Sequence, residues 1–193
     1  MRGIIFVISG PSGSGKTTLA EHVLGDRKLK KKLFRSISFT TRPRRSREKD
    51  KKDYYFITPE EFKKYLKAKK ILEWTKYLGY YYATPKDVVD KRLKAGKSVI
   101  LCLDFKGAAK IKRLYPKNTI TIFVAPPSLE VLTHRIKNRC HRTGLHEIRR
   151  RVEIAKKELL NARHYDYCLL NQDLEAAQKE LKEIIIHNLT KEG

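Results

Sequence analysis

The sequence predicts an α/β fold in which a parallel β-sheet is flanked by helices. Apolar runs of strand length alternate with longer stretches of helical spacing along most of the 193 residues. The first apolar run, residues 4–8, leads through a glycine-rich loop into a helix. Two later runs, residues 98–103 and 119–124, are mostly apolar, which is typical of strands buried on both faces in parallel sheets. Residues 36–82 depart from this pattern with short aromatic strands, which indicates an inserted small mixed sheet.

Each element of the main pattern has a local signal. The first strand is β-branched, and the helix after the glycine loop covers residues 17–24. Gly96 ends one helix, Asp104 follows a strand, and a Pro-Pro pair ends another strand. The remaining strands are expected at residues 33–39, 98–103, 119–124 and 167–170, and the remaining helices at residues 85–95, 105–114, 128–137, 147–163 and 174–189.

The insertion starts with a polar, arginine-rich loop over residues 40–53 and a strand over residues 54–57. Thr58, Pro59 and Glu61 then provide an N-cap, a first-turn proline and a capping-box carboxylate, so a helix is predicted to about residue 68. Two aromatic stretches, residues 71–77 and 80–82, flank a glycine and are expected to form a hairpin.

The glycine-rich loop fits the phosphate-binding pattern G-x-x-x-x-G-K-S/T, and a strand before it and a helix after it are the context that this pattern needs. Glycines allow the backbone to turn its N–H groups inward around a phosphate, and the helix N-terminus adds partial positive charge. Lys16 can reach the β- and γ-phosphates, and the Thr17 hydroxyl can bind Mg²⁺. We therefore expect a bound nucleoside triphosphate, held by Gly10, Pro11, Ser12, Gly13, Ser14, Gly15, Lys16, Thr17 and Thr18.

Composition narrows the class of protein. The hydrophobic content of 40% argues against disorder, and the apolar runs are too short to span a membrane, so no membrane association is expected. Three widely spaced cysteines predict a reducing compartment, the cytoplasm. The net charge of +23 is concentrated in residues 27–53, with +10, and in residues 135–151, with +6, which favours anionic substrates and leaves a nucleic-acid partner possible on charge alone.

The insertion carries a second set of polar residues with their own chemistry. Arg42 and Arg45 follow a short strand, and arginine forks suit a phosphate. Tyrosine hydroxyls at Tyr54 and Tyr82 can add hydrogen bonds to the same phosphate. The carboxylate of Glu73 can accept two hydrogen bonds from a nucleobase.

Taken together, these residues and motifs closely resemble those of the guanylate kinase family of P-loop nucleoside monophosphate kinases. The matching pieces occur in family order over almost the entire chain: G-P-S-G-S-G-K-T-T-L, S-I-S-F-T-T-R-P, D-Y-Y-F-I, E-E-F, L-E-W, G-Y-Y-Y-A-T-P, V-A-P-P-S and Y-D-Y-C-L-L-N-Q-D-L. The resemblance implies a P-loop NTPase fold and ATP-dependent phosphorylation of GMP or dGMP to GDP with Mg²⁺.

The resemblance also implies roles for individual residues. GMP binding falls to Ser38, Arg42, Arg45, Tyr54, Glu73, Tyr82, Thr84 and Asp104. The transferring phosphate is surrounded by Lys16, Arg42, Arg135, Arg139 and Arg151, and Asn171 contacts the donor adenine. Thr17 is expected to bind Mg²⁺, whereas Asp104 belongs either to the magnesium side or to the guanine pocket.

The same resemblance implies one domain over residues 1–193, acting as a monomer or a homodimer. Its core comprises residues 1–35 and 97–193, with a GMP-binding insertion at about residues 36–90 and a lid at about residues 138–150. The sequence departs from the family pattern at several positions. Cys102 stands where relatives have the first carboxylate of Asp-x-Asp, Lys106 where they have Gln, and Arg47 where they have Gly. The loop at residues 50–52 also lacks the usual glycine, and the lid is one residue longer.

Three alternatives to a GMP kinase remain. The first keeps the fold and transfers phosphate to another small phosphorylated acceptor. The second is a peptide-binding module like the guanylate-kinase-like domains of scaffolding proteins, against which the intact Gly15-Lys16-Thr17 argues. The third is a nucleic-acid-binding protein, which only the charge supports.

Overall fold

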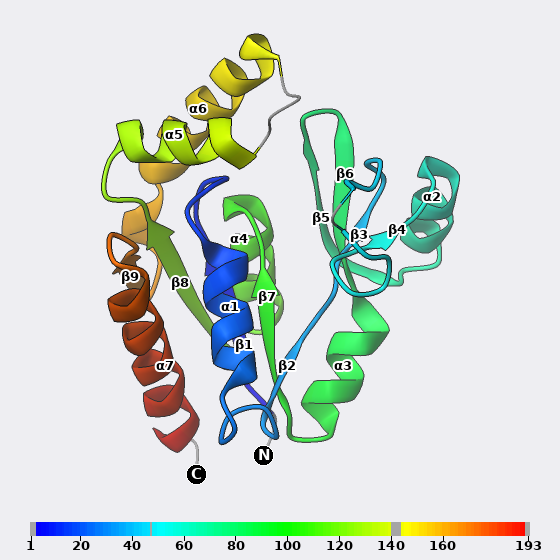
Figure 1. Cartoon of the computed structure of the whole chain (residues 1–193). Helices are drawn as coiled ribbons and strands as arrows, with labels where there is room; N and C mark the ends of the chain where they lie inside the picture. Colours follow the sequence, from blue (N-terminus) through cyan, green and yellow to red (C-terminus); the bar gives the residue numbers. More distant parts are fainter. Residues whose placement is uncertain (1–2, 47, 140–143, 192–193) are drawn as a thin grey trace.

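The computed structural model describes residues 3–46, 48–139 and 144–191. These residues form two sheets (Figure 1). The strands are β1 (Ile5–Ser9), β2 (Leu33–Arg35), β3 (Phe39–Thr40), β4 (Tyr55–Phe56), β5 (Ile71–Tyr77), β6 (Tyr80–Pro85), β7 (Ser98–Cys102), β8 (Thr119–Ala125) and β9 (Tyr167–Leu170). The helices are α1 (Lys16–Gly25), α2 (Pro59–Lys67), α3 (Lys86–Lys94), α4 (Phe105–Leu114), α5 (Leu129–Arg139), α6 (Leu145–Leu159) and α7 (Leu174–Lys191), with a short 3₁₀ helix at Ala162–His164.

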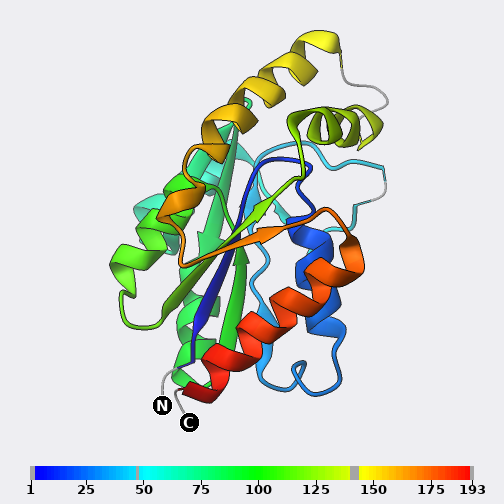
Figure 2. The same ribbon diagram turned by 90° about the vertical axis from the view of Figure 1, so that its left-hand side faces the viewer.

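The first sheet has the order β2-β7-β1-β8-β9, and all its pairs are parallel. Its central strand β1 is fully buried. Alternate residues point to opposite faces, so Phe6 and Ile8 pack against α1 and α7, whereas Ile5 and Val7 pack against α3 and α4. Figure 2 shows the sheet between these two helical layers. The predicted parallel α/β fold is confirmed.

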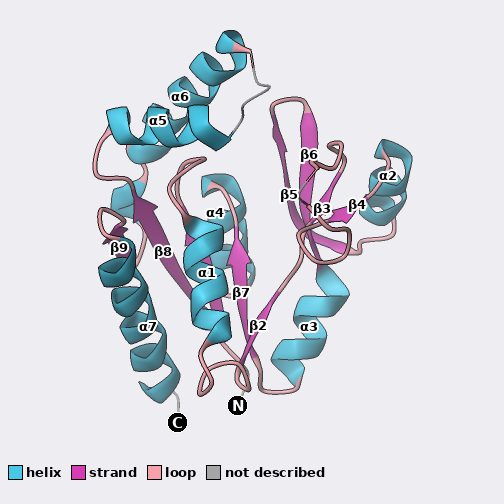
Figure 3. Ribbon diagram, in the orientation of Figure 1, coloured by secondary structure: helices cyan, strands magenta, loops and turns pink. Residues whose placement is uncertain are grey.

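The second sheet has the order β4-β3-β6-β5 and is mixed (Figure 3). Strands β3 and β4 are parallel, whereas β6 runs antiparallel to both β3 and β5. The hairpin between β5 and β6 turns at Leu78 and Gly79, whose φ angles of 50° and 89° are left-handed. The predicted N-terminus of α2 is confirmed, since Thr58 and Glu61 form a capping box.

Several predicted boundaries differ from the structure. The single strand expected at residues 33–39 is two strands in different sheets, because the Ser36 amide bonds to Ile100 of β7 while the Ser38 carbonyl accepts from Tyr55. The helix expected at residues 147–163 starts at Leu145 and ends at Leu159. Strand β6 continues to Pro85, so the helix expected from that residue starts one residue later.

Helices α5 and α6 pack together through Leu132, Ile136, Ile148 and Ala155. They lie beyond the carboxyl ends of β1 and β8, next to the glycine-rich loop (Figure 1). The predicted lid, residues 138–150, includes residues 140–143, which lie outside the described residues. Over the ranges that the structure describes, no helix is both long enough and apolar enough to cross a membrane.

Candidate active site

A cleft of about 970 Å³ lies between the carboxyl ends of the core strands, the small sheet and the α5–α6 pair. Open α/β sheets bind ligands at this edge. Most of the residues predicted for the site line this one cleft: Gly10, Ser12, Gly13, Gly15, Lys16, Thr17, Thr18, Ser38, Arg42, Arg45, Tyr54, Glu73, Tyr82, Asp104, Arg135, Arg151 and Asn171.

The glycine-rich loop connects β1 to α1 and is tightly packed. Gly15 has a φ of 96°, and a Cβ at this position would collide with the side chain of Asn171. Asn171 is 4% exposed, and its Nδ2 donates to the Ser14 carbonyl over 2.7 Å. Asn171 therefore anchors the loop from the end of β9, a contact in addition to the adenine contact that the resemblance implies.

Lys16 is the first residue of α1. Its ammonium group donates to the carbonyls of Gly10 and Pro11, over 2.5 and 2.8 Å. The Lys16 side chain thus folds back over the loop, and its ammonium group lies against the backbone at Gly10 and Pro11. A phosphate entering the loop would meet this ammonium, the loop amides and the N-terminus of α1 together.

Arg42 lines the cleft on the side of the small sheet and is largely buried. Its side chain is 8% exposed, and its guanidinium carbon lies 5.0 Å from the Tyr54 ring centroid and 5.5 Å from that of Phe56. The rings of Tyr54 and Tyr82 meet edge to face at 5.9 Å. Two predicted tyrosines and a predicted arginine are therefore brought together around one point, suited to an anion.

Glu73 lies deeper, on β5, and is 5% exposed. Its Oε1 accepts from the Thr84 hydroxyl over 2.5 Å, and its Oε2 lies so close to Gly107 of α4 that a Cβ there would be 2.8 Å away. Burial raises the pKa of Glu73 to about 7, with Asp104 adding to the shift and Thr84 opposing it. Over the ranges that the structure describes, no salt bridge includes Glu73, so its buried carboxylate is poised to accept hydrogen bonds from a neutral donor.

Two residues at the end of β7 complete the floor. Asp104 is the N-cap of α4, where its Oδ1 accepts from the Gly107 amide over 2.8 Å, so one oxygen is already used structurally. Burial raises the pKa of the Cys102 thiol, and Arg35 and Lys16 only partly oppose this. Cys102 is thus a neutral group where the family has a carboxylate.

The α5–α6 side supplies further cations. Arg135 donates from Nη2 to the Asn171 carbonyl over 3.2 Å, which ties α5 to the loop after β9. Arg151 is 8% exposed and pairs with Glu147 one turn earlier, at 2.5 Å. Arg139 is the last residue of α5, and its side chain lies outside what the structure describes.

Three other predicted residues do not line the cleft directly. Pro11 and Ser14 belong to the glycine-rich loop and contribute their backbone carbonyls to Lys16 and Asn171. Thr84 lies behind Glu73.

Sequence reasoning missed several carboxylates near the site, of which Glu158 and Glu48 contact or face its predicted cations. Glu158 of α6 lines the cleft, and burial raises its pKa to about 7, while Lys16 acts to lower it. Glu48 pairs with Arg42. Glu158 lies in an ordinary helical pattern, whereas Glu48 is the first acidic residue after a run of arginines, which is a usable signal.

Comparisons with known proteins place the whole chain in one family. The guanylate kinase family model matches residues 2–188. A guanylate kinase of Hyphomonas neptunium is 40% identical over 188 residues, which cover 96% of this chain and 83% of that protein. A guanylate kinase of Rickettsia typhi is 42% identical over 186 residues, with coverages of 96% and 91%.

A solved structure agrees with the sequence matches. The crystal structure of guanylate kinase from Anaplasma phagocytophilum superposes with a TM-score of 0.78 at 29% identity, and the match covers 97% of this chain and 86% of that one. This likeness confirms the P-loop NTPase fold that the resemblance implied. Family model, relatives and structure agree over nearly the full length, so the chain belongs to the guanylate kinase family, whose members are nucleoside monophosphate kinases.

Proposed function

We propose that this chain transfers the γ-phosphoryl group of ATP to GMP, or to dGMP, and releases GDP or dGDP. The observation that carries the proposal is that one cleft holds a phosphate-binding loop, a group of arginines and a buried carboxylate. The loop suits the donor triphosphate, the arginines suit phosphates, and the carboxylate suits a purine with adjacent N–H donors.

Guanine selection rests on Glu73. Guanine presents its N1–H and exocyclic amine side by side, so an ionised carboxylate can accept from both. Adenine has an acceptor at N1 and would leave the buried charge of the carboxylate without its hydrogen bonds. In comparable sites, such a mismatch lowers kcat/KM by several orders of magnitude. Thr84 orients the Glu73 carboxylate through its hydroxyl, and Ser38 and Asp104 line the same end of the cleft.

The phosphate of GMP would bind to Arg42 and Arg45, with the hydroxyls of Tyr54 and Tyr82 beside it. Arg42 is rigid because it is buried and stacked on two rings. A fixed fork holds an acceptor oxygen in line with the incoming γ-phosphorus better than a flexible lysine does.

The triphosphate would bind along the glycine-rich loop, with Lys16 between its outer phosphates and Asn171 bracing the loop near the adenine. The residues present fit Mg²⁺: Thr17 offers a hydroxyl, Asp104 retains one carboxylate oxygen, and Mg²⁺ in kinases needs few protein ligands because phosphates and waters supply the rest. When bound, Mg²⁺ would neutralise charge on the transferring phosphates.

Phosphoryl transfer requires alignment and cations rather than covalent help. Arg135, Arg139 and Arg151 would surround the transferring group from the α5–α6 side. We propose that residues 138–150 act as a lid over the core of residues 1–35 and 97–193, with residues 36–90 as the GMP-binding region. Closure would exclude water and limit wasteful ATP hydrolysis.

The cytoplasm is the proposed location, since both cysteines in the described ranges are free, as expected in a reducing compartment. A monomer or a homodimer would each satisfy this mechanism.

The test is a coupled assay with ATP, Mg²⁺ and a panel of monophosphates. GMP and dGMP should be phosphorylated far faster than AMP, CMP or UMP, and equal turnover of all would remove the guanine argument. Lys16→Ala should abolish turnover with the fold retained by circular dichroism. Retained activity in this variant would refute the role of Lys16.

A further inference from the structure

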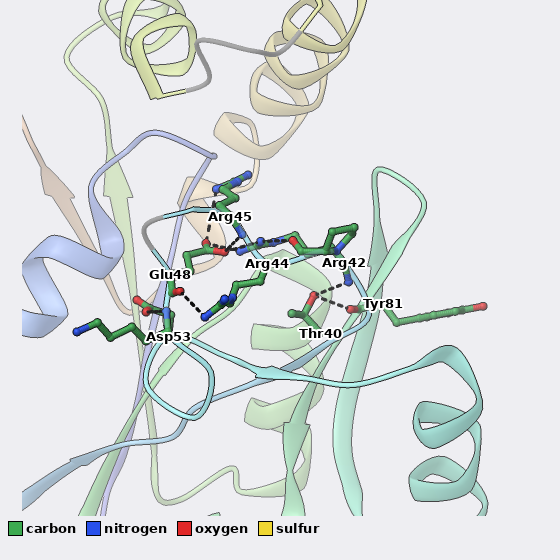
Figure 4. Close-up of polar contacts among 9 residues, drawn as sticks. Thr40, Arg42, Arg44, Arg45, Glu48, Asp53 and Tyr81 are labelled. Atoms are coloured by element: carbon green, nitrogen blue, oxygen red, sulfur yellow. Dashed lines mark hydrogen bonds and ion pairs between the residues drawn. The ribbon is translucent and has the colours of Figure 1, made fainter.

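Glu48 lies directly behind the arginine that faces the proposed acceptor phosphate (Figure 4). Its two oxygens accept from the terminal nitrogens of Arg42, Nη1 to Oε2 at 2.7 Å and Nη2 to Oε1 at 2.5 Å. The side chains are 14% and 8% exposed, so the pair is largely shielded from water. Arg42 lines the cleft and Glu48 does not.

These bonds leave one particular edge of the arginine. A guanidinium carries five N–H groups. Glu48 takes one from each terminal nitrogen, and the Pro43 carbonyl takes the second from Nη1 over 2.9 Å. The Nε–H and the outer Nη2–H remain, and they form the second two-pronged edge of the group. Among the described residues, no hydrogen bond occupies that edge.

The same carboxylate also orders the loop around Arg42. Its Oε2 accepts from the Arg45 amide over 3.0 Å, and the Glu48 amide donates to the Arg45 carbonyl over 3.1 Å. Arg44 reaches the Glu48 carbonyl at 3.4 Å. One residue thus connects the side chain of Arg42 to the backbone that carries Arg45, as the dashed lines in Figure 4 show.

The chemistry of the pair supports a fixed, ionised contact. Burial acts to raise the pKa of Glu48, but the hydrogen bonds from Arg42 and from the Arg45 amide outweigh it and lower that pKa. The carboxylate therefore stays charged at neutral pH. A bidentate end-on contact fixes the rotation of the guanidinium plane as well as its position.

Building on the phosphoryl transfer to GMP proposed above, we propose that Glu48 is a positioning residue for the acceptor phosphate. It holds Arg42 by its Nη1/Nη2 end so that the Nε/Nη2 edge points into the cleft, and it holds the turn that presents Arg45. Glu48 acts only through these arginines and does not touch the substrate.

The proposal predicts a selective defect in Glu48→Gln. The amide has nearly the size of the carboxylate, but its NH₂ faces an N–H of Arg42, so the two-pronged contact is lost. We expect the KM for GMP to rise about 10- to 100-fold, as for a lost hydrogen bond to a charged group. The KM for ATP and the inhibition constant of guanosine, which has no phosphate, should stay within about twofold.

Asp50→Asn is the matched control. Asp50 lies in the same loop and accepts from the Phe56 amide over 3.1 Å, and no contact joins it to Arg42 in the described chain. Its variant perturbs the loop but keeps the Arg42–Glu48 pair, so its KM for GMP should remain near that of the parent.

A mutant cycle makes the assignment specific. In an Arg42→Gln background, adding Glu48→Gln should raise the KM for GMP by a clearly smaller factor than in the parent, because only the turn that presents Arg45 is left for Glu48 to hold. If Glu48→Gln alone does not fold, this step still tests the proposal, since a rise of about 10- to 100-fold between Arg42→Gln and the double variant would show that Glu48 does not act mainly through Arg42.

Three results would overturn the role of Glu48 while the parent phosphorylates GMP: an unchanged KM for GMP in folded Glu48→Gln, an equal loss of guanosine affinity, or full additivity with Arg42→Gln. Absence of GMP turnover in the parent would instead refute the proposed function.

Discussion

At the scale of single residues, Glu73 should make guanine binding depend on pH. Burial raises its pKa to about 7. Only the ionised carboxylate accepts both guanine donors, so binding weakens as pH falls through this value. Guanosine affinity should be about tenfold lower at pH 6 than at pH 8, following the ionised fraction. Guanosine is the suitable ligand because it carries no titrating phosphate.

Isothermal titration calorimetry with guanosine measures this pH profile, and Glu73→Gln is the control. Its weaker guanosine affinity should be flat between pH 6 and pH 8, because an amide does not titrate. A parent profile as flat as that of the variant would mean that the Glu73 carboxylate does not bind the base.

Gly107 provides a second test at this scale. A Cβ there would lie 2.8 Å from Glu73 Oε2 and 3.3 Å from Asp104 Oδ1, so the Glu73 carboxylate would have to move. Gly107→Ala should lower kcat/KM for GMP by about 10- to 100-fold, as for a displaced catalytic contact. Alanine favours a helix interior over glycine, so thermal stability should not fall in parallel.

Steady-state kinetics with GMP and ATP, together with thermal melting, would check this. Gly25→Ala is the control, because nothing lies within 4 Å of a Cβ at that position. Unaltered GMP kinetics in Gly107→Ala would show that the Glu73 carboxylate has room to move, which would contradict its tight packing against Gly107.

At the scale of elements, Asp104 caps α4 and also places a negative charge in the cleft, and one substitution can separate these two roles. As the N-cap of α4, it accepts from the Gly107 amide, and asparagine can do the same. Asp104→Asn should therefore melt near the parent temperature but lose activity, since the charge facing the cleft is removed. Asp104→Ala should lose activity and about 1 kcal/mol of stability as well.

Thermal melting and the coupled assay on both variants test this separation. Full activity in Asp104→Asn would limit the residue to helix capping. A large loss of stability in the same variant would contradict the equivalence of the two caps.

Element types and the separate mixed sheet were predicted from the sequence, but the point at which the chain passes from one sheet to the other was not. Residues 4–8, 98–103 and 119–124 are apolar enough that only a buried parallel strand fits them. The stretch 33–39 has one local pattern, yet its two halves pair with β7 and with β4 and β6. The switch depends on partners far along the chain, which no local pattern contains.

In the candidate site, some residues were assigned from the sequence, whereas other features depend on how the elements pack. The loop residues were assigned because phosphate chemistry restricts the residue types at fixed spacing, whereas Arg42 was assigned from its place after a short strand and from the family resemblance. The Glu73 carboxylate was identified from its sequence setting, but its burial against Gly107 comes from packing of β5 on α4. Glu158 was not identified, because its position facing Lys16 follows from how α6 crosses the cleft.

At the scale of the whole molecule, two groups stand out among the 44 lysines and arginines behind the net charge of +23. Arg42, Arg45, Arg135 and Arg151 line the cleft. A separate set is exposed on the loop between α1 and β2, at the end of the core opposite the cleft (Figure 1): Arg27, Lys28, Lys30, Lys31 and Lys32. In the proposed function the first set binds phosphates, whereas the second forms a solvated basic surface.

This division predicts weak, salt-sensitive association with nucleic acid. Binding of duplex DNA or single-stranded RNA should disappear by about 200 mM salt, as expected for contacts with phosphates alone. Fluorescence anisotropy over a salt series would measure it. Micromolar or tighter binding that persists at that salt would instead favour a nucleic-acid function.

In the proposed mechanism, the Glu73 carboxylate selects the base of the acceptor nucleotide. The most direct measurement is kcat/KM for GMP and IMP, in the parent and in Glu73→Gln. IMP keeps the N1–H but lacks the exocyclic amine, so it can fill only one of the two bonds to the carboxylate. The parent should prefer GMP by about tenfold or more, and the variant should lose most of this preference. Equal use of both nucleotides by the parent, or the same preference in the variant, would contradict the account.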